Sequence, residues 1–299
     1  MPPRGLPGNA NLEQLRNGAK SFQRAVRAAP AAALARAIAA EWGLTLGDRL
    51  EPGVASEWIG RARTSDGAEV VLKLSRRHWE GDHEADGLLA WDGGGAIRCL
   101  RSAQREDTCI LLLESCRPGT ALGAVVSEVE QDVIVAGLLG RLWQAPIATD
   151  APFRPLQFMC DRWASSFERR MRVDGCGLDP GLARAGHAAL RELPATATRT
   201  VLLCTDLHAG NVLAARREPW LVIDPKPFVG DPAYDVVQHM LNCDERLTTD
   251  PVALAGRMAA LVDLDPERVS RWLFARCAQE AIDDLRLRTV AQRLASAVL

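Results

Sequence analysis

The stretch Cys204-Thr-Asp-Leu-His-Ala-Gly-Asn-Val-Leu-Ala-Ala-Arg-Arg-Glu-Pro-Trp-Leu-Val-Ile-Asp224 places three oxygen-bearing side chains, Asp206, Asn211 and Asp224, at the ends of short apolar runs. The apolar runs predict strands at 201–204, 212–215 and 220–223, with a turn at 216–219. Because a tight hairpin brings its two ends together, Asn211 before its first strand and Asp224 after its second should lie side by side.

These three side chains suggest metal binding and proton transfer. Two neighbouring oxygen ligands, Asn211 and Asp224, suit a hard cation such as magnesium. Asp206 is not needed for the metal, so it could orient a hydroxyl group and accept its proton. Aspartate and asparagine are also common turn and cap residues, which would explain any one of them alone. Three that converge favour a catalytic site.

Composition narrows the class of protein. The 299 residues are 47% hydrophobic with a formal net charge of -2, which indicates a globular core and no basic excess for a nucleic acid or an anionic membrane. Residues 1–20 contain no apolar segment of signal-peptide length, so we expect a cytoplasmic protein. The eight cysteines include no close CxxC pair, which argues against a zinc knuckle or a redox dithiol.

The remaining patterns predict a strand-rich segment followed by a helical one. An alanine-rich stretch at 25–40 favours a helix that begins near Pro30. We expect strands at 58–63, 69–74, 96–100 and 109–113, a helix at 79–91, and helices at 127–143, 157–172, 181–192 and after Asp231. Residues 116–119 break the pattern, and we place the domain boundary there, with a ligand cleft between the two parts.

A lysine on the predicted strand 69–74 is a candidate phosphate ligand. Val71 and Lys73 share one face of that strand, and the intervening apolar residues share the other. A lone lysine in a strand is more often a surface residue whose stem covers apolar groups. Glu84, on one face of the next predicted helix with Leu88 and Trp91, is a candidate partner that favours a functional pair.

The segment Asp206-Leu-His-Ala-Gly-Asn211, followed by Ile223-Asp224, resembles the catalytic and metal-binding segments of aminoglycoside phosphotransferases, which are relatives of protein kinases. Asp224-Pro-Lys-Pro-Phe-Val-Gly-Asp-Pro-Ala-Tyr-Asp235 looks most like the streptomycin 6-phosphotransferase and hydroxyurea phosphotransferase branch. The resemblance runs from about Leu34 to Arg276. It implies an α+β, bilobal, protein-kinase-like fold, with a nucleotide-binding lobe at 1–115 that holds an antiparallel sheet and one helix, and a mainly helical catalytic and acceptor-binding lobe at 116–299.

Carried over residue by residue, the resemblance implies a catalytic Asp206 and two magnesium ligands, Asn211 and Asp224. It makes Lys73 the lysine on the phosphates of ATP or GTP and Glu84 the acid that orients it. The other residues implied to bind the nucleotide are Val71, the hinge from Glu114 to Cys116, and the segment 53–57 over the phosphates, which lacks the repeated glycines of protein kinases.

This chain has Cys204-Thr205 where these families usually carry His-Gly. The change removes a histidine that supports the catalytic loop and replaces a glycine, so we predict a working kinase whose loop has a modified support. His208 is interpreted as a hydrogen-bonding residue that structures the loop, and Asp231 as the N-cap of a helix.

An acidic cluster near the end of the chain could bind the acceptor. Glu280, Asp283 and Asp284 fall within one turn of a predicted helix, in the region where related enzymes build the acceptor pocket. Carboxylates there would suit a polycationic aminoglycoside. The alternative is a solvated helix face, countered by Arg286 and Arg288.

The resemblance therefore predicts a monomeric, ATP- and magnesium-dependent small-molecule O-phosphotransferase with streptomycin or a related aminoglycoside as acceptor, and no nucleic-acid or membrane partner. One alternative is a kinase of the same fold that acts on hydroxyurea or on a metabolite, because acceptor pockets vary more than phosphate machinery. A second is a nucleotide-binding regulatory protein without turnover, suggested by Cys204-Thr205 and the glycine-poor segment.

Overall fold

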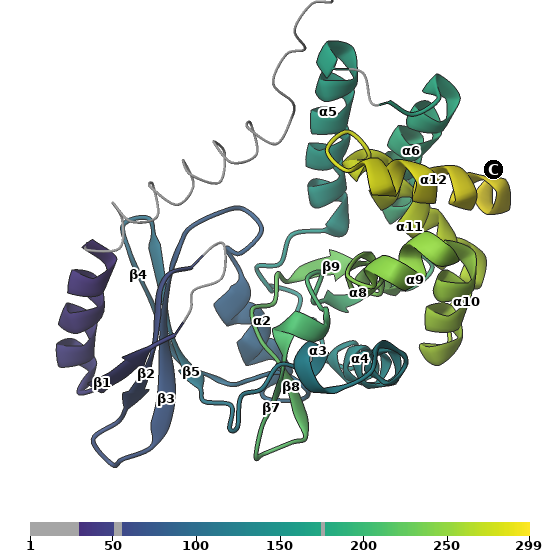
Figure 1. Ribbon diagram of the computed structural model, residues 1–299. Helices are drawn as coiled ribbons and strands as arrows, with labels where there is room; N and C mark the ends of the chain where they lie inside the picture. The colour runs from purple at the N-terminus through teal and green to yellow at the C-terminus, as the bar shows by residue number, and fades with distance from the viewer. Residues whose placement is uncertain (1–29, 51–55, 175–176) are drawn as a thin grey trace, which may run out of the picture. The chain divides into compact units, whose positions relative to one another are not determined.

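The structure is a computed structural model that describes residues 30–50, 56–174 and 177–299 (Figure 1). The chain forms two compact units. Unit 1 lies within Met1–Arg77 and Cys99–Ser115, and unit 2 comprises His78–Arg98 and Cys116–Leu299. Residues 78–98 therefore group with the mainly helical part of the chain rather than with the strands on either side of them. The assignment of nucleotide binding to 1–115 and catalysis to 116–299 stays a prediction.

Unit 1 is built on a five-stranded antiparallel sheet whose strand order is β1-β2-β3-β5-β4. The strands are β1 Thr45–Arg49, β2 Ser56–Arg63, β3 Glu69–Arg76, β4 Cys99–Arg105 and β5 Thr108–Glu114. β2 and β3 form the predicted hairpin around the turn at 65–67, and β3 also pairs with β5. The predicted strands at 58–63, 69–74 and 109–113 are confirmed.

One face of this sheet packs against a helix formed by residues 30–42, drawn in purple in Figure 1. Leu72 and Leu74 of β3 are fully buried, and they lie in one apolar cluster with Ala35 and Ile38 of that helix. The alternation predicted for β3 is therefore confirmed, because its even-numbered apolar residues form the core of unit 1. Lys73, on the opposite face, is only 4% exposed, which excludes the interpretation as a surface lysine.

Unit 2 is mainly helical. Its helices are α2 Glu84–Trp91, α3 Leu122–Val125, α4 Glu128–Leu142, α5 Leu156–Asp174, α6 Pro180–Glu192, α7 Pro232–Asp235, α8 Val237–Leu241, α9 Asp244–Thr249, α10 Pro251–Leu261, α11 Pro266–Glu280 and α12 Leu285–Val298. The predicted helices at 127–143, 157–172 and 181–192 are confirmed as α4, α5 and α6. α11 packs against α6, α10 and α12, and its Trp272 and Phe274 are fully buried.

Asp-Pro pairs start four of these helices. Asp179, Asp231, Asp250 and Asp265 are the N-caps of α6, α7, α10 and α11, and each side chain accepts a backbone N–H from the first turn. Proline suits the first helical position because its fixed φ is helical and its missing N–H has no partner there. The N-cap role expected of Asp231 is confirmed. A fifth pair, Asp224-Pro225, starts no helix.

Two small sheets position the site in unit 2. β6 Val201–Leu203 pairs antiparallel with β9 Phe228–Gly230, and β7 Val212–Ala214 forms a hairpin with β8 Trp220–Val222. The hairpin has a neighbour on each side. Thr120 O accepts the N–H of Ala214 at 2.9 Å, and Ile97 N–H donates to Val222 O at 3.0 Å. The predicted hairpin is confirmed, and both of its strands are held in place.

Two sequence predictions were wrong about boundaries. The helix predicted at 79–91 begins only at Glu84, because the preceding chain turns: Gly81 N–H donates to the carbonyl of His78 at 3.0 Å, and Asp82 pairs with Arg154 at 2.8 Å. The strand predicted at 96–100 begins at Cys99, because Ala96 instead bridges to β8 of unit 2. In both places, a contact with a residue far along the chain prevents the structure that the local sequence pattern predicts.

Among the described residues, no helix has the length and apolar character needed to cross a membrane.

Candidate active site

The three oxygen-bearing residues of the opening stretch converge in unit 2. β6 leads into the loop that carries Asp206, and the short 3-10 turn Ala209–Asn211 leads into β7. Asn211 Nδ2 donates to the backbone oxygen of Asp206 at 3.0 Å. Ile223 N–H donates to Asn211 O at 2.9 Å, which brings Asp224 beside Asn211 as the hairpin predicted. One loop and one hairpin thus gather Asp206, Asn211 and Asp224.

Lys226 lies between the two carboxylates, a position that no sequence pattern predicted. Its Nζ is 3.0 Å from Asp224 Oδ2 and 3.6 Å from Asp206 Oδ2. The ammonium also donates to the backbone oxygen of Asp224 at 3.0 Å, and the side chain is 12% exposed. A signal was available in the sequence: only three of the 36 basic residues are lysines, and one of them follows Asp224 by two positions.

Burial sets the electrostatics of this loop. Burial raises the pKa of Asp206, while the nearby Lys226 and His208 act in the opposite direction and Asp224 adds to the rise. A carboxylate with a raised pKa is a stronger proton acceptor near neutral pH. Burial lowers the pKa of His208, and its Nδ1 accepts the N–H of Gly210 at 3.1 Å. The interpretation of His208 as a residue that structures the loop is confirmed.

The loop is supported from behind by Asp235 at the end of α7. Its Oδ1 accepts the N–H of Thr205 at 2.6 Å, and its Oδ2 accepts the N–H of Cys204 at 3.0 Å and Trp143 Nε1–H at 2.9 Å. Burial raises the pKa of Asp235 to about 6, and these three donors favour its ionised form. The support expected from a histidine at position 204 comes instead from a buried carboxylate, which the sequence analysis did not identify.

Thr205 has a backbone conformation that glycine adopts more readily than other residues. Its φ is 53°, in the left-handed region that a β-branched residue rarely adopts. The Thr205 hydroxyl donates to the backbone oxygen of Lys226 at 2.5 Å, and Asp235 holds its N–H. These bonds keep the backbone before Asp206 in its left-handed turn without glycine.

The donor set suits a magnesium ion. Because the Asn211 nitrogen binds the Asp206 carbonyl, the atom that the amide can offer a cation is Oδ1. A carboxylate and an amide oxygen are hard ligands, as magnesium prefers. The ammonium of Lys226 against Asp224 shows that positive charge is already favoured at this position. The residues therefore fit the metal that the resemblance implies.

The residues predicted to bind the nucleotide are divided between the units. Val71, Lys73 and Glu114 lie in unit 1 on β3 and β5, whereas Glu84 and Cys116 lie in unit 2. Glu84 is the first residue of α2, and like Lys73 it is buried. The roles of these residues stay predictions. Residues 53–55 of the predicted phosphate-covering segment lie outside the described residues, and 56–57 belong to β2.

Each acid of the predicted acceptor cluster has an arginine partner. Glu280 pairs with Arg276 at 3.1 Å, and Asp283 pairs with Arg170 at 2.6 Å. Asp284 accepts the backbone N–H of Arg286 at 2.9 Å and is the N-cap of α12. The expectation that all three share one helical turn was wrong, because α11 ends at Glu280 and this cap starts a new helix. Acceptor binding by these residues stays a prediction.

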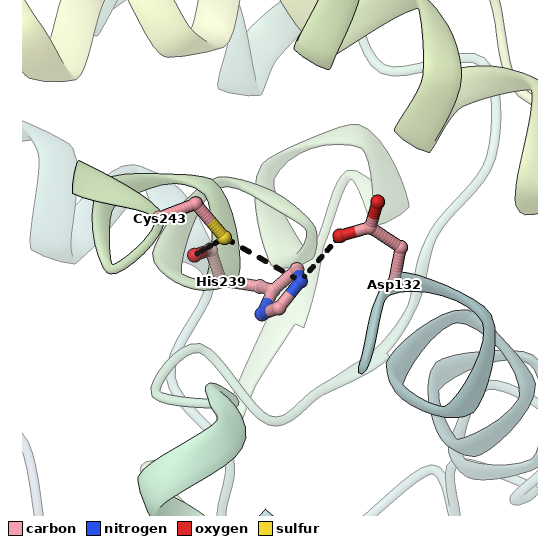
Figure 2. A group of neighbouring side chains, drawn as sticks. All are labelled: Asp132, His239 and Cys243. Carbon is pink, nitrogen blue, oxygen red and sulfur yellow. Dashed lines mark hydrogen bonds and ion pairs between the residues drawn. The ribbon is translucent and has the colours of Figure 1, made fainter. Parts of the chain in front are cut away.

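A second group in unit 2, Asp132, His239 and Cys243, has the composition of a metal site (Figure 2). His239 Nε2 lies 2.9 Å from Asp132 Oδ1 and 3.8 Å from Cys243 Sγ, so one nitrogen faces both neighbours. Burial raises the pKa of Cys243 to about 12, which favours its neutral thiol beside His239.

The carboxylate of Asp132 is also fully occupied. Arg246 binds both of its oxygens, at 3.0 and 2.7 Å, and Arg257 Nε binds Oδ2 at 2.7 Å. Burial alone would raise the pKa of Asp132, but hydrogen bonds from His239, Arg246 and Arg257 outweigh it and hold the pKa well below its usual range. Two guanidinium groups disfavour another cation here. We interpret the group as a structural ion-pair network that joins α4, α8, α9 and α10.

Comparison with known proteins agrees with the geometry. Residues 43–286 match the family described as aminoglycoside/hydroxyurea antibiotic resistance kinase. A streptomycin 6-kinase from Streptomyces glaucescens is 32% identical over 262 residues, which cover 85% of this chain and 82% of that protein. A hydroxyurea phosphotransferase from Kitasatospora aureofaciens is 34% identical over 245 residues, which cover 81% of this chain and 69% of that protein.

Solved structures show the same fold at lower identity. The macrolide 2'-phosphotransferase of Brachybacterium faecium superposes with a TM-score of 0.53 at 17% identity, covering 86% of this chain and 96% of that chain. With the five-stranded antiparallel sheet and the helices that follow it, this likeness confirms the predicted α+β, protein-kinase-like fold.

Proposed function

We propose that this chain, which belongs to the aminoglycoside/hydroxyurea antibiotic resistance kinase family and is a small-molecule kinase, phosphorylates a hydroxyl group of streptomycin or a related aminoglycoside. The phosphoryl donor in this proposal is ATP, and the metal is magnesium. The observation that carries the proposal is the convergence of Asp206, Asn211 and Asp224 on one loop and one hairpin.

The proposed reaction is a direct transfer. The acceptor oxygen forms a bond to the γ-phosphorus while the bond from that phosphorus to the bridging oxygen breaks, and ADP leaves. The Asp206 carboxylate orients the acceptor hydroxyl and takes its proton. Because burial raises the pKa of Asp206, its carboxylate holds that proton better than an exposed one would. Asp235 acts only by holding the backbone of the loop that carries Asp206, and Trp143 donates to the Asp235 carboxylate.

Asn211 Oδ1 and the Asp224 carboxylate would hold magnesium, which when bound offsets negative charge on the phosphates. Lys73 is proposed to bind the phosphates, with Glu84 as the acid that orients it. Val71, Glu114 and Cys116 are proposed to contact the nucleotide. The altered pair Cys204-Thr205 does not argue against turnover, because Asp235 holds the loop in the left-handed turn that precedes Asp206.

The test combines an acceptor panel with one variant. Purified protein is incubated with ATP, magnesium and a single acceptor, and products are identified by mass spectrometry. We expect a phosphorylated streptomycin product from the wild-type protein. Asp206→Asn should bind ATP normally and lose on the order of 10²-fold or more in kcat, because it removes the proton acceptor.

Asp263→Asn is the matched control, since it makes the same chemical change at an exposed turn of unit 2. It should keep wild-type kcat. Undiminished turnover in Asp206→Asn would remove Asp206 from the proposed role.

Hydroxyurea is the second candidate acceptor, favoured by the 34% identity to a hydroxyurea phosphotransferase. It belongs in the same panel. A product from hydroxyurea but not from any aminoglycoside would replace the first proposal with the second.

A further inference from the structure

The backbone of Lys226 is anchored independently of its side chain. Its N–H donates to Cys204 O at 2.9 Å, and its carbonyl accepts the Thr205 hydroxyl at 2.5 Å. Pro225 and Pro227 flank it and fix φ on both sides. The main chain is therefore held against the loop of Asp206, while the four-carbon stem of the side chain keeps its rotatable bonds.

The two ion pairs of Lys226 are unequal. The distance of 3.0 Å to Asp224 Oδ2 is a direct charge-assisted hydrogen bond, whereas 3.6 Å to Asp206 Oδ2 is a longer electrostatic contact. The resting partner of the ammonium is thus the candidate metal ligand. Asp206 is left with a weaker contact, so its carboxylate stays available to an acceptor hydroxyl.

The choice of lysine is itself informative. This chain uses arginine for nearly all of its basic side chains and keeps only Lys20, Lys73 and Lys226 as lysines. A guanidinium is a planar fork suited to one fixed carboxylate, whereas an ammonium is a compact charge that can change partners. A position between two carboxylates at a phosphoryl-transfer site therefore favours an ammonium, which can change partners.

We propose that Lys226 is a further catalytic residue: its ammonium neutralises the candidate metal ligand Asp224 in the resting site and contacts the transferred phosphoryl group during the reaction. This inference rests on the proposed phosphotransferase activity. Lys226 neither gains nor loses a proton. The acceptor oxygen bonds to phosphorus, the bond to ADP breaks, the acceptor proton passes to Asp206, and Lys226 offsets the charge on the phosphoryl oxygens.

The experiment compares Lys226→Met, which removes the charge and keeps an unbranched stem, with Lys226→Arg, which keeps the charge. The first readout is binding of Mn²⁺ alone to the nucleotide-free protein, followed by the electron paramagnetic resonance signal of free Mn²⁺. We expect Lys226→Met to bind Mn²⁺ about 10-fold more tightly than wild type, because no ammonium then competes for Asp224. Lys226→Arg should stay within about 3-fold of wild type, since its charge remains.

Whether Lys226→Met binds Mn²⁺ more tightly or more weakly than wild type distinguishes the proposed role of Lys226 from a purely structural one. If Lys226 merely held Asp206 and Asp224 together, its loss would weaken Mn²⁺ binding. Unchanged or weaker binding in Lys226→Met, with a circular dichroism melt like that of wild type, would overturn the proposal.

The second readout is turnover of the acceptor found in the panel. Lys226→Met should lose about 10²-fold in kcat with little change in the KM of the acceptor, because the lost contact is made mainly in the transition state. Undiminished kcat in this variant would also overturn the proposal. Failure of the wild-type protein to phosphorylate any acceptor would count against the proposed function instead, and the Mn²⁺ measurement would still decide the role of Lys226 at the resting site.

Discussion

Thr205 shows how one residue can keep a strained backbone in place. A β-branched side chain at a φ of 53° costs on the order of 1–3 kcal/mol. Its N–H and hydroxyl are bound to Asp235 and to the backbone of Lys226. Both bonds connect Thr205 to groups next to the catalytic loop. They therefore stabilise the strained backbone conformation directly before Asp206, which must point at its acceptor.

Two substitutions at this position separate strain from hydrogen bonding. Thr205→Gly relieves the strain but loses the hydroxyl bond, so its free energy of unfolding should stay within about 1 kcal/mol of wild type. Thr205→Val keeps the strain and leaves the carbonyl of Lys226 without this donor, which should cost about 1–3 kcal/mol. Urea unfolding of both variants checks this. A Thr205→Val protein as stable as Thr205→Gly would contradict the account.

At the scale of elements, the close approach of α6 and α11 depends on a missing side chain. A Cβ added at Gly186 would lie 2.4 Å from the Cβ of Ala278, well inside van der Waals contact. Neither atom is the end of a flexible chain, so a methyl group at this position would push the helices apart. α11 also packs against α10 and α12, so it has little freedom to move.

Gly186→Ala should therefore destabilise the protein by about 1–3 kcal/mol, even though alanine is the better helix former. Gly137→Ala is the matched control, because that glycine lies within α4 and an added Cβ meets nothing within 4 Å. The control should be stabilised by up to about 1 kcal/mol. Thermal unfolding of the two variants compares them, and equal melting temperatures would show that the helix contact is not tight.

At the scale of the whole molecule, buried ion pairs tie distant segments of unit 2 together. Asp132 on α4 is fully buried and binds His239, Arg246 and Arg257, which lie on α8, α9 and α10. Removing one partner of a buried pair leaves the other charges uncompensated. Stability of the helical unit should thus depend on the ionised form of this single carboxylate.

Asp132→Asn should cost about 3–5 kcal/mol of unfolding free energy at neutral pH. Because the pKa of Asp132 is lowered in the folded protein, its stabilisation is present above the ordinary value of 3.8 and declines as the pH falls below it. The difference in unfolding free energy between wild type and variant should then narrow by about 1.4 kcal/mol for each unit by which the pH falls below that value. Urea unfolding from pH 7 down to about pH 3 measures this difference. A difference that is constant with pH would show that the stabilisation does not come from the ionised carboxylate of Asp132.

Local patterns of the sequence determined a large part of this protein. Asp-Pro pairs start α6, α7, α10 and α11, and alternation in β3 separates its core face from the face of Lys73. The hairpin brings Asn211 beside Asp224. Each of these features acts over one helical turn or one strand pair, so residues near one another in the sequence suffice to specify it. The motif around Asp206 also identified the family.

Only the tertiary structure decided which groups support the site and which buried charges pair in unit 2. The place of Lys226 between two carboxylates, the support of Thr205 by Asp235, and the network of Asp132 all join residues from different segments. The same is true where α2 starts late, because Asp82 pairs with Arg154 far along the chain. Periodicity and turn chemistry describe a segment by itself, whereas these contacts exist only once packing has brought segments together and burial has made each unpaired charge costly.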